Sequence, residues 1–153
     1  MARGVLLAFS LFVVVAAVAV GSGGIGATDT DVEDSANVTL VSAPTDGIVL
    51  ERGRFGSGRY HIDAPPAVVD VSDVTGTPTL RYAIDIPAAW LTLTSRYDLA
   101  GREGELRMGA SPATVSPERI DQGRYEAIVA VWLRTGVHER SLVQRRVTVE
   151  VRQ

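Results

Sequence analysis

The fold of this chain is decided by the seven residues 121–127, Asp-Gln-Gly-Arg-Tyr-Glu-Ala, and by the strand-like run that follows them. Asp121 and Gly123 favour a turn, because aspartate caps turns locally and glycine tolerates a positive φ. Tyr125 begins the apolar, alternating run, where a phenol can bury its ring while its hydroxyl reaches a backbone partner. An ordinary turn before a β-strand would use the same residues, so the surrounding sequence has to be weighed with the motif.

From residue 38 onward the sequence alternates apolar and polar residues in short segments. Glycine, proline and other turn residues separate these segments at short intervals. Short strands with such punctuation predict an all-β sandwich or barrel. The candidate strands are residues 38–41, 48–50, 59–63, 68–71, 79–86, 90–95, 105–108, 124–134 and 142–152.

The two last segments show the pattern most clearly. In 142–152, valines alternate with polar and charged residues, as in an antiparallel strand with one buried face. Arg145 interrupts the apolar row, and we expect it near the open end of the strand. In 124–134, alternate residues from Tyr125 to Leu133 form an apolar row that is expected to face the core. The opposite face of this segment carries Ile128 and Trp132. We therefore expect a loop or a partner over that second face.

The motif at 121–127 resembles the D-x-G-x-Y-x-C signature of immunoglobulin-like domains. This resemblance implies that Tyr125 starts a central strand and that its hydroxyl bonds the backbone of the preceding corner. Ala127 stands at the cysteine position, as in disulfide-free fibronectin type III-like and bacterial or archaeal Ig-like sandwiches. We expect an immunoglobulin-like antiparallel β-sandwich over residues 37–153, with Asp121, Gly123 and Tyr125 as its fold motif.

The N-terminus predicts an export signal. Arg3 precedes an apolar run over 5–20, and a small-residue stretch ends at Ala27, as in a secretory signal peptide. An uncleaved membrane anchor is the alternative, because residues 4–27 carry no charge and a helix of that length crosses a hydrocarbon core of about 30 Å. Residues 1–27 are therefore expected to be a signal peptide or a membrane-anchor helix.

Acidic residues follow this segment without any basic residue among them. Residues 28–36 are predicted to be an acidic, solvated tether, since a calcium loop would need a glycine that the segment lacks. Arg3 on the other side of the apolar run keeps the N-terminus cytoplasmic by the positive-inside rule. The predicted location is extracytoplasmic, either secreted or tethered to the cytoplasmic membrane.

Composition narrows the chemistry further. All 15 basic residues are arginine, cysteine is absent and the net charge is −3, so disulfides, thiolate sites, Schiff-base lysines and general attraction to nucleic acid are excluded. A lysine-free, exported chain with an acidic tether resembles small secreted or anchored proteins of halophilic archaea. That resemblance implies a saline habitat and a location, and no reaction.

Two features are candidates for modification or recognition. Asn37 begins an Asn-Val-Thr sequon for N-glycosylation, although such triplets also occur by chance. The loop around residues 51–60 could bind an anionic polymer or stack on a sugar, or it could be a mobile hairpin with solvated arginines. Its candidate recognition residues are Arg52, Arg54, Phe55, Arg59 and Tyr60.

No catalytic constellation is recognisable. His61 and His138 lack metal-ligand spacing, and Ser57 does not lie in a nucleophile elbow. We expect no catalytic or metal site, no cofactor and no enzymatic activity. The prediction is a structural or protein-interaction module of the cell envelope; the alternative is a carbohydrate- or ligand-binding module. An envelope protein or a glycan is the expected partner, with the membrane itself if residues 1–27 are retained.

Overall fold

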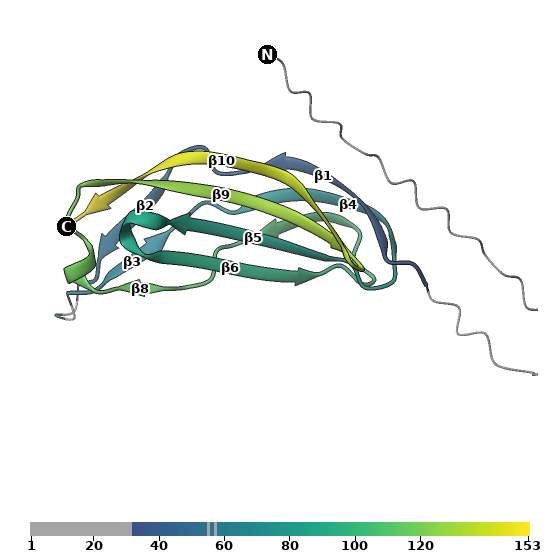
Figure 1. Ribbon diagram of the computed structural model, residues 1–153, viewed down its shortest axis with the longest axis horizontal. Helices are drawn as coiled ribbons and strands as arrows, with labels where there is room; N and C mark the ends of the chain where they lie inside the picture. The colour runs from purple at the N-terminus through teal and green to yellow at the C-terminus, as the bar shows by residue number, and fades with distance from the viewer. Residues whose placement is uncertain (1–31, 55, 57) are drawn as a thin grey trace, which may run out of the picture. The chain divides into compact units, whose positions relative to one another are not determined.

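The computed structural model describes residues 32–54, 56 and 58–153. Within them the chain forms two β-sheets that enclose one apolar core, so the predicted all-β sandwich is confirmed (Figure 1). The smaller sheet has the order β1-β4-β7, with β1 (Ser35–Ser42), β4 (Ala67–Thr75) and β7 (Gly104–Met108). The larger has the order β6-β5-β9-β10-β2-β3-β8, with β6 (Leu91–Asp98), β5 (Thr79–Ile86), β9 (Arg124–Thr135), β10 (His138–Arg152), β2 (Ile48–Arg52), β3 (Tyr60–Asp63) and β8 (Thr114–Val115).

The predicted signal or anchor, residues 1–27, lies outside the described residues, as do residues 28–31 of the predicted tether. Helical structure in the part of the chain that is described amounts to two short 3₁₀ turns, η1 (Pro87–Ala89) and η2 (Pro117–Arg119). No helix among those residues is long and apolar enough to cross a bilayer. β1 begins at Ser35, so the last two residues of the predicted 28–36 tether already belong to the sandwich.

Strand directions define two ends of the sandwich. β5 and β10 are both antiparallel to β9, and β2 is parallel to β10, so β2, β5 and β10 all end on the same side. This side holds the loop after β2, the turn after β5 and the C-terminus, and we call it the Trp90 end (Figure 1). The opposite side, where β1 begins, is called the Asp34 end.

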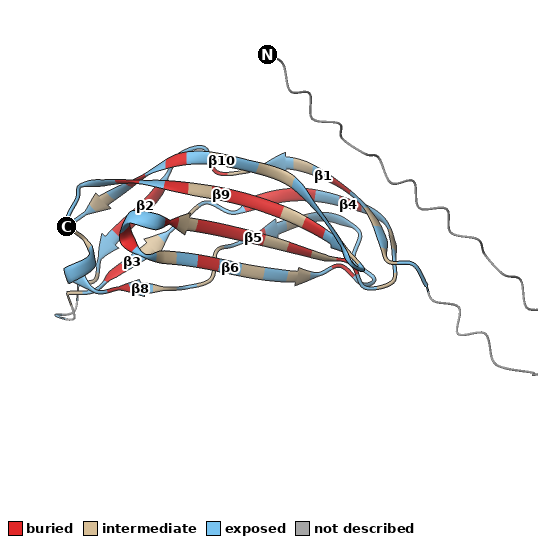
Figure 2. Cartoon of the chain, viewed as in Figure 1, coloured by how far each residue is buried: buried red, intermediate tan, exposed pale blue. Residues whose placement is uncertain are grey.

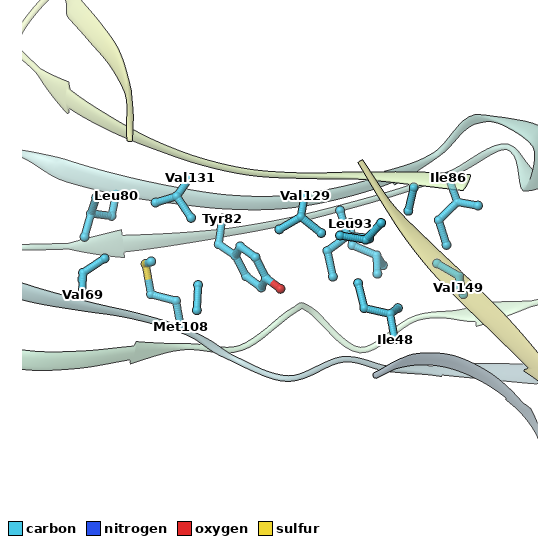
Figure 3. Close-up of a cluster of buried hydrophobic side chains, with 14 of the residues drawn as sticks. Ile48, Val69, Leu80, Tyr82, Ile86, Leu93, Met108, Val129, Val131 and Val149 are labelled. Atoms are coloured by element: carbon cyan, nitrogen blue, oxygen red, sulfur yellow. The ribbon is translucent and has the colours of Figure 1, made fainter. Parts of the chain in front are cut away.

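Alternation along the strands builds the core. The inward row of β5 is Leu80, Tyr82, Ile84 and Ile86, and each of these is at most 1% exposed. β9 pairs with β5 and places Val129 and Val131 in the same layer (Figure 3). Buried positions run along β5 and β9, whereas β10 is mostly exposed (Figure 2). The period-two pattern therefore predicted the core face of these strands correctly.

The Tyr125 hydroxyl ties the corner before β9 to that strand, as the fold motif predicted. Its oxygen accepts hydrogen bonds from the backbone N–H groups of Asp121 at 2.8 Å and Gln122 at 3.1 Å. The same hydroxyl lies 3.0 Å from Oδ1 of Asp121 and 3.3 Å from the carbonyl oxygen of Arg119, either of which can accept its proton. The ring is buried, so one side chain joins the core to the corner. This arrangement and the strand order are consistent with an immunoglobulin-like sandwich.

The expected role of Gly123 is wrong. Its φ is not positive, and a Cβ at this position would meet no atom within 4 Å. Its carbonyl oxygen accepts a hydrogen bond from the N–H of Val151 at 3.0 Å, a contact that any residue could make. Ala127 is buried at the cysteine position, and apolar packing holds the sheets there.

Asp34 fastens the start of the sandwich to two turns. Its Oδ1 accepts a hydrogen bond from the N–H of Thr77 at 2.6 Å, and its Oδ2 accepts one from the N–H of Gly136 at 3.2 Å. These residues lie in the turns before β5 and between β9 and β10. Gly76, beside Thr77, has a φ of +68° and approaches Asp34 so closely that a Cβ would collide with it. The last acidic residue before β1 is thus part of the fold.

The sequence predicted Arg145 near the open end of β10, and this prediction is wrong. Arg145 lies opposite Val129, near the middle of the strand. It occupies the inward row between Val143 and Val147, where it is half-buried. Residues 138–148 of β10 pair with β9 on one side and with no described strand on the other. An inward-pointing charge on such a free edge hinders pairing with another chain.

Candidate binding surfaces

Trp90 is the most exposed aromatic residue among the described positions. It follows η1 in the turn between β5 and β6, and it is 84% exposed. Its backbone is left-handed, with φ 50° and ψ 43°, and its N–H donates to the carbonyl oxygen of Pro87 at 3.0 Å. A bulky residue rarely adopts this conformation, which costs about 1 kcal/mol or more. The turn therefore holds an indole in water at an energetic cost.

The predicted recognition loop lies at the same end. The N–H of Gly53 donates to the carbonyl oxygen of Arg59 at 2.8 Å and closes the neck of the loop. Arg52, Arg54 and Arg59 are exposed. Tyr60 is only 5% exposed, so it belongs to the core and leaves the predicted recognition set. Phe55 lies outside the described residues.

The separation between Trp90 and this loop limits what could touch both. β5 and β2 are three strand spacings apart in the larger sheet, which corresponds to about 14 Å. One small ligand would not bridge that distance. A protein surface or an extended polymer would, so the Trp90 end is suited to a large partner.

The outward pair on β9 is partly covered by the chain itself. Ile128 and Trp132 are half-buried on the outer face of the larger sheet. The guanidinium carbon of Arg81 lies 4.3 Å from the centre of the Trp132 ring, and Nη2 of Arg81 lies 2.8 Å from Oε1 of Glu139. The cover expected over this face is therefore supplied in part by an arginine of the neighbouring strand β5.

Sequence reasoning missed a group of arginines on this face. Arg81, Arg96 and Arg134 line one hollow of about 180 Å³ near the Asp34 end. Each belongs to a different strand, and β5, β6 and β9 are neighbours in the sheet. Arg81 and Arg134 occupy outward positions of the predicted strands 79–86 and 124–134, whereas Arg96 lies just beyond the predicted strand 90–95. Only the pairing register places the three together.

The histidines and the sequon have ordinary surroundings. His61 is exposed on β3, where its ring lies against Gly53, and His138 is exposed at the start of β10. No three His, Cys, Asp or Glu side chains are grouped as metal ligands in the described part of the chain. Asn37 is exposed on β1, and its Nδ2 donates to Oδ2 of Asp73 at 2.8 Å. A glycan on Asn37 would replace one of the two hydrogens on this Nδ2 and leave one N–H to donate.

The pKa of Tyr82 is raised to about 12, mainly because burial disfavours the phenolate and secondarily because of Tyr97. The Tyr82 hydroxyl donates to the carbonyl oxygen of Pro65 at 3.3 Å. Its ring lies in the core beside Val129 (Figure 3). The raised pKa is thus a property of the core and points to no reaction.

Comparisons with known proteins give no family. No protein-family model matches the chain, and no curated protein sequence matches it. Among solved structures, the chain is similar to the collagen-binding subdomain of the surface protein ACE of Enterococcus faecalis, at 13% sequence identity. That match covers 73% of this chain and 99% of the subdomain, with a TM-score of 0.26. A score this low supports no inference about this chain.

Proposed function

We propose that this chain is a non-enzymatic, extracytoplasmic protein-interaction module of the cell envelope, built on an immunoglobulin-like sandwich. Residues 1–27 would export it as a signal peptide or hold it to the membrane as an anchor. The partner would be another envelope protein. Nucleic acid is an unsuitable partner for a chain of net charge −3.

The exposure and backbone conformation of Trp90 carry this proposal. Folding gives no reason to hold an indole 84% exposed in a left-handed conformation, and tryptophan is among the residues enriched where proteins bind one another. Strained residues that persist in a fold cluster at binding sites. Trp90 follows the end of β5, whereas Ser35 begins β1 at the opposite end of the sandwich.

Site-specific crosslinking in intact membranes tests the proposal. A photoreactive amino acid replaces Trp90 in one variant and Glu105 in a control variant. Glu105 is exposed on β7 of the smaller sheet, away from the turn that holds Trp90. We expect a protein adduct from position 90 and none from position 105. Recovery of monomer alone from position 90 under all conditions would contradict a protein partner.

Carbohydrate binding at the same end is the second candidate. Exposed arginines of the 53–59 loop and the exposed indole of Trp90 are suited to hydrogen-bonding and stacking on a glycan. Replacing Arg54 and Phe55 with alanine should abolish binding on a glycan array if this loop recognises sugar. Unchanged binding would remove the loop from the site.

Two further expectations belong to the same proposal. If the signal is cleaved, mass spectrometry of the exported protein should find an N-terminus near Thr28, whereas an anchor would leave the segment in place. Glycosylation of Asn37 should add glycan mass that Asn37→Gln abolishes.

A further inference from the structure

The arginine hollow is a second surface, separate from the Trp90 end. It lies on the outer face of the larger sheet near the Asp34 end. Arg81 on β5 stands directly opposite Arg96 on β6, and Arg134 on β9 stands opposite Thr79 on β5. Arginines from three adjacent strands therefore border the same hollow. The lining of the hollow consists of Thr79, Arg81, Arg96, Arg134, Val137 and Glu139.

The charges in this hollow are not balanced. Like charges directly opposite each other destabilise a strand pair, yet Arg81 and Arg96 occupy such positions. Glu139 is the one acidic residue in the lining, and it is paired with Arg81 at 2.8 Å. Three positive charges against one negative charge leave +2 in this lining, and the carboxylate of Asp34 in the adjoining hollow lowers the local excess to +1, on a chain whose total is −3. An external anion would relieve this repulsion.

Hydrogen-bond donors are also left over. Arg96 makes no hydrogen bond or ion pair with any described residue, and Arg134 uses only its Nε, which donates to the carbonyl oxygen of Gly136 at 3.1 Å. The Nε of Arg81 is buried without a partner in the described structure. Asp34 lines the adjoining hollow with Arg96 and Arg134, but both of its carboxylate oxygens already accept backbone N–H groups.

We propose that this hollow binds the carboxylates of an acidic segment on a partner protein. Planar guanidinium groups hold carboxylates through paired, charge-assisted hydrogen bonds, and Arg96 and Arg134 have the free N–H groups to do so. A sugar would need an exposed aromatic face, whereas the ring of Trp132 is covered by Arg81 at 4.3 Å. This inference rests on the proposed interaction function and adds the chemistry of the partner.

Titration with fluorescently labelled hexaglutamate tests the site, using the full-length protein in neutral detergent at low ionic strength. Arg96→Gln and Arg134→Gln each remove one guanidinium group from an exposed position. The matched control is Arg146→Gln, because Arg146 is exposed on β10, also on the outer face, and its Nη1 lies 3.8 Å from Glu126 outside the hollow. Thermal melts confirm that all variants are folded.

We expect each hollow variant to weaken hexaglutamate binding about tenfold, since a hydrogen bond to a charged group contributes roughly that factor. Arg146→Gln should leave the affinity within about twofold, and added salt should weaken binding by the wild-type protein. Equal weakening by all three substitutions, or no binding by the wild type, would overturn the proposal.

A second titration uses a sulfated oligosaccharide in place of hexaglutamate. It distinguishes an acidic protein segment from an anionic glycan as the source of the bound anion. If it binds more tightly than hexaglutamate and depends on the same two arginines, the acidic-protein assignment is overturned. Crosslinking at position 90 is independent of this titration. If position 90 gives no protein adduct but hexaglutamate binds normally, only the proposed function is contradicted. If position 90 gives an adduct but hexaglutamate does not bind, only this inference is contradicted.

Discussion

Removing one oxygen atom, by Tyr125→Phe, should measurably weaken the whole sandwich. The substitution keeps the buried ring and deletes the hydroxyl that accepts the N–H groups of Asp121 and Gln122. Both donors are partly buried, and an unsatisfied buried donor costs about 1–3 kcal/mol. Because the corner can admit some water, we expect the free energy of unfolding to fall by about 2 kcal/mol.

The corresponding thermal shift follows from the size of the domain. Residues 31–153 form one compact unit, and unfolding entropy is about 2.1 cal/mol/K per residue near 60 °C. For about 120 residues this gives about 250 cal/mol/K, so a loss of 2 kcal/mol lowers Tm by about 8 °C. Thermal melts and urea titrations of the two proteins measure the difference, and an unchanged m-value would show that the unfolding transition is otherwise the same.

Tyr97→Phe is the matched control for the loss of a hydroxyl. The Tyr97 hydroxyl makes one exposed hydrogen bond, to the carbonyl oxygen of Gly109 at 3.0 Å. We expect this change to cost about 0.5 kcal/mol, since water can replace the lost donor. If Tyr125→Phe is no more destabilising than Tyr97→Phe, the corner does not fasten β9 and the reasoning fails.

Three more substitutions test other parts of the sandwich. Gly76→Ala should cost about 2 kcal/mol or more in urea unfolding, because the new Cβ collides with Asp34 and the φ of +68° is unfavourable; a neutral effect would contradict the close approach. Trp90→Gly should raise stability in urea unfolding by up to about 1 kcal/mol, since glycine adopts a φ of 50° freely; a destabilised variant would mean that the indole supports the fold. Because the pKa of Tyr82 is raised from 10 to about 12, the unfolded chain loses this proton first and wild-type stability should fall between pH 10 and 12 by at most about 3 kcal/mol relative to Tyr82→Phe; parallel pH profiles of the two proteins would exclude this linkage.

The sequence predicted what depends on local pattern. Alternation located the strands and the inward row of β5, and the motif at Tyr125 predicted a corner that the structure contains. β10 begins at His138, four residues before the predicted start at 142. The pattern missed residues 138–141 because they are polar on both faces of the strand and show no alternation. The two-residue strand β8 was missed, since its pairing with β3 depends on distant residues.

The candidate sites were less predictable, because they depend on register and on local backbone conformation. Tyr60 belongs both to the predicted strand 59–63 and to the predicted recognition loop, and its burial at the start of β3 assigns it to the strand. Arg81 and Arg96 are 15 positions apart in sequence, and only the hairpin register makes them opposite neighbours. The left-handed conformation of Trp90 has no sequence signal at all, since the same residues could form an ordinary turn.

The strand directions, together with the Asp34 contacts, suggest how the domain would respond to a pulling force. The chain enters at the Asp34 end, and its last strand leaves at the Trp90 end, so tension between the two termini runs along the strands. Hydrogen bonds between β1 and β4, and between β10 and its neighbours, are then loaded in shear and must break together rather than one by one. A module attached at one end and gripped at the other would resist extension well, with Asp34 as the first point to bear the force.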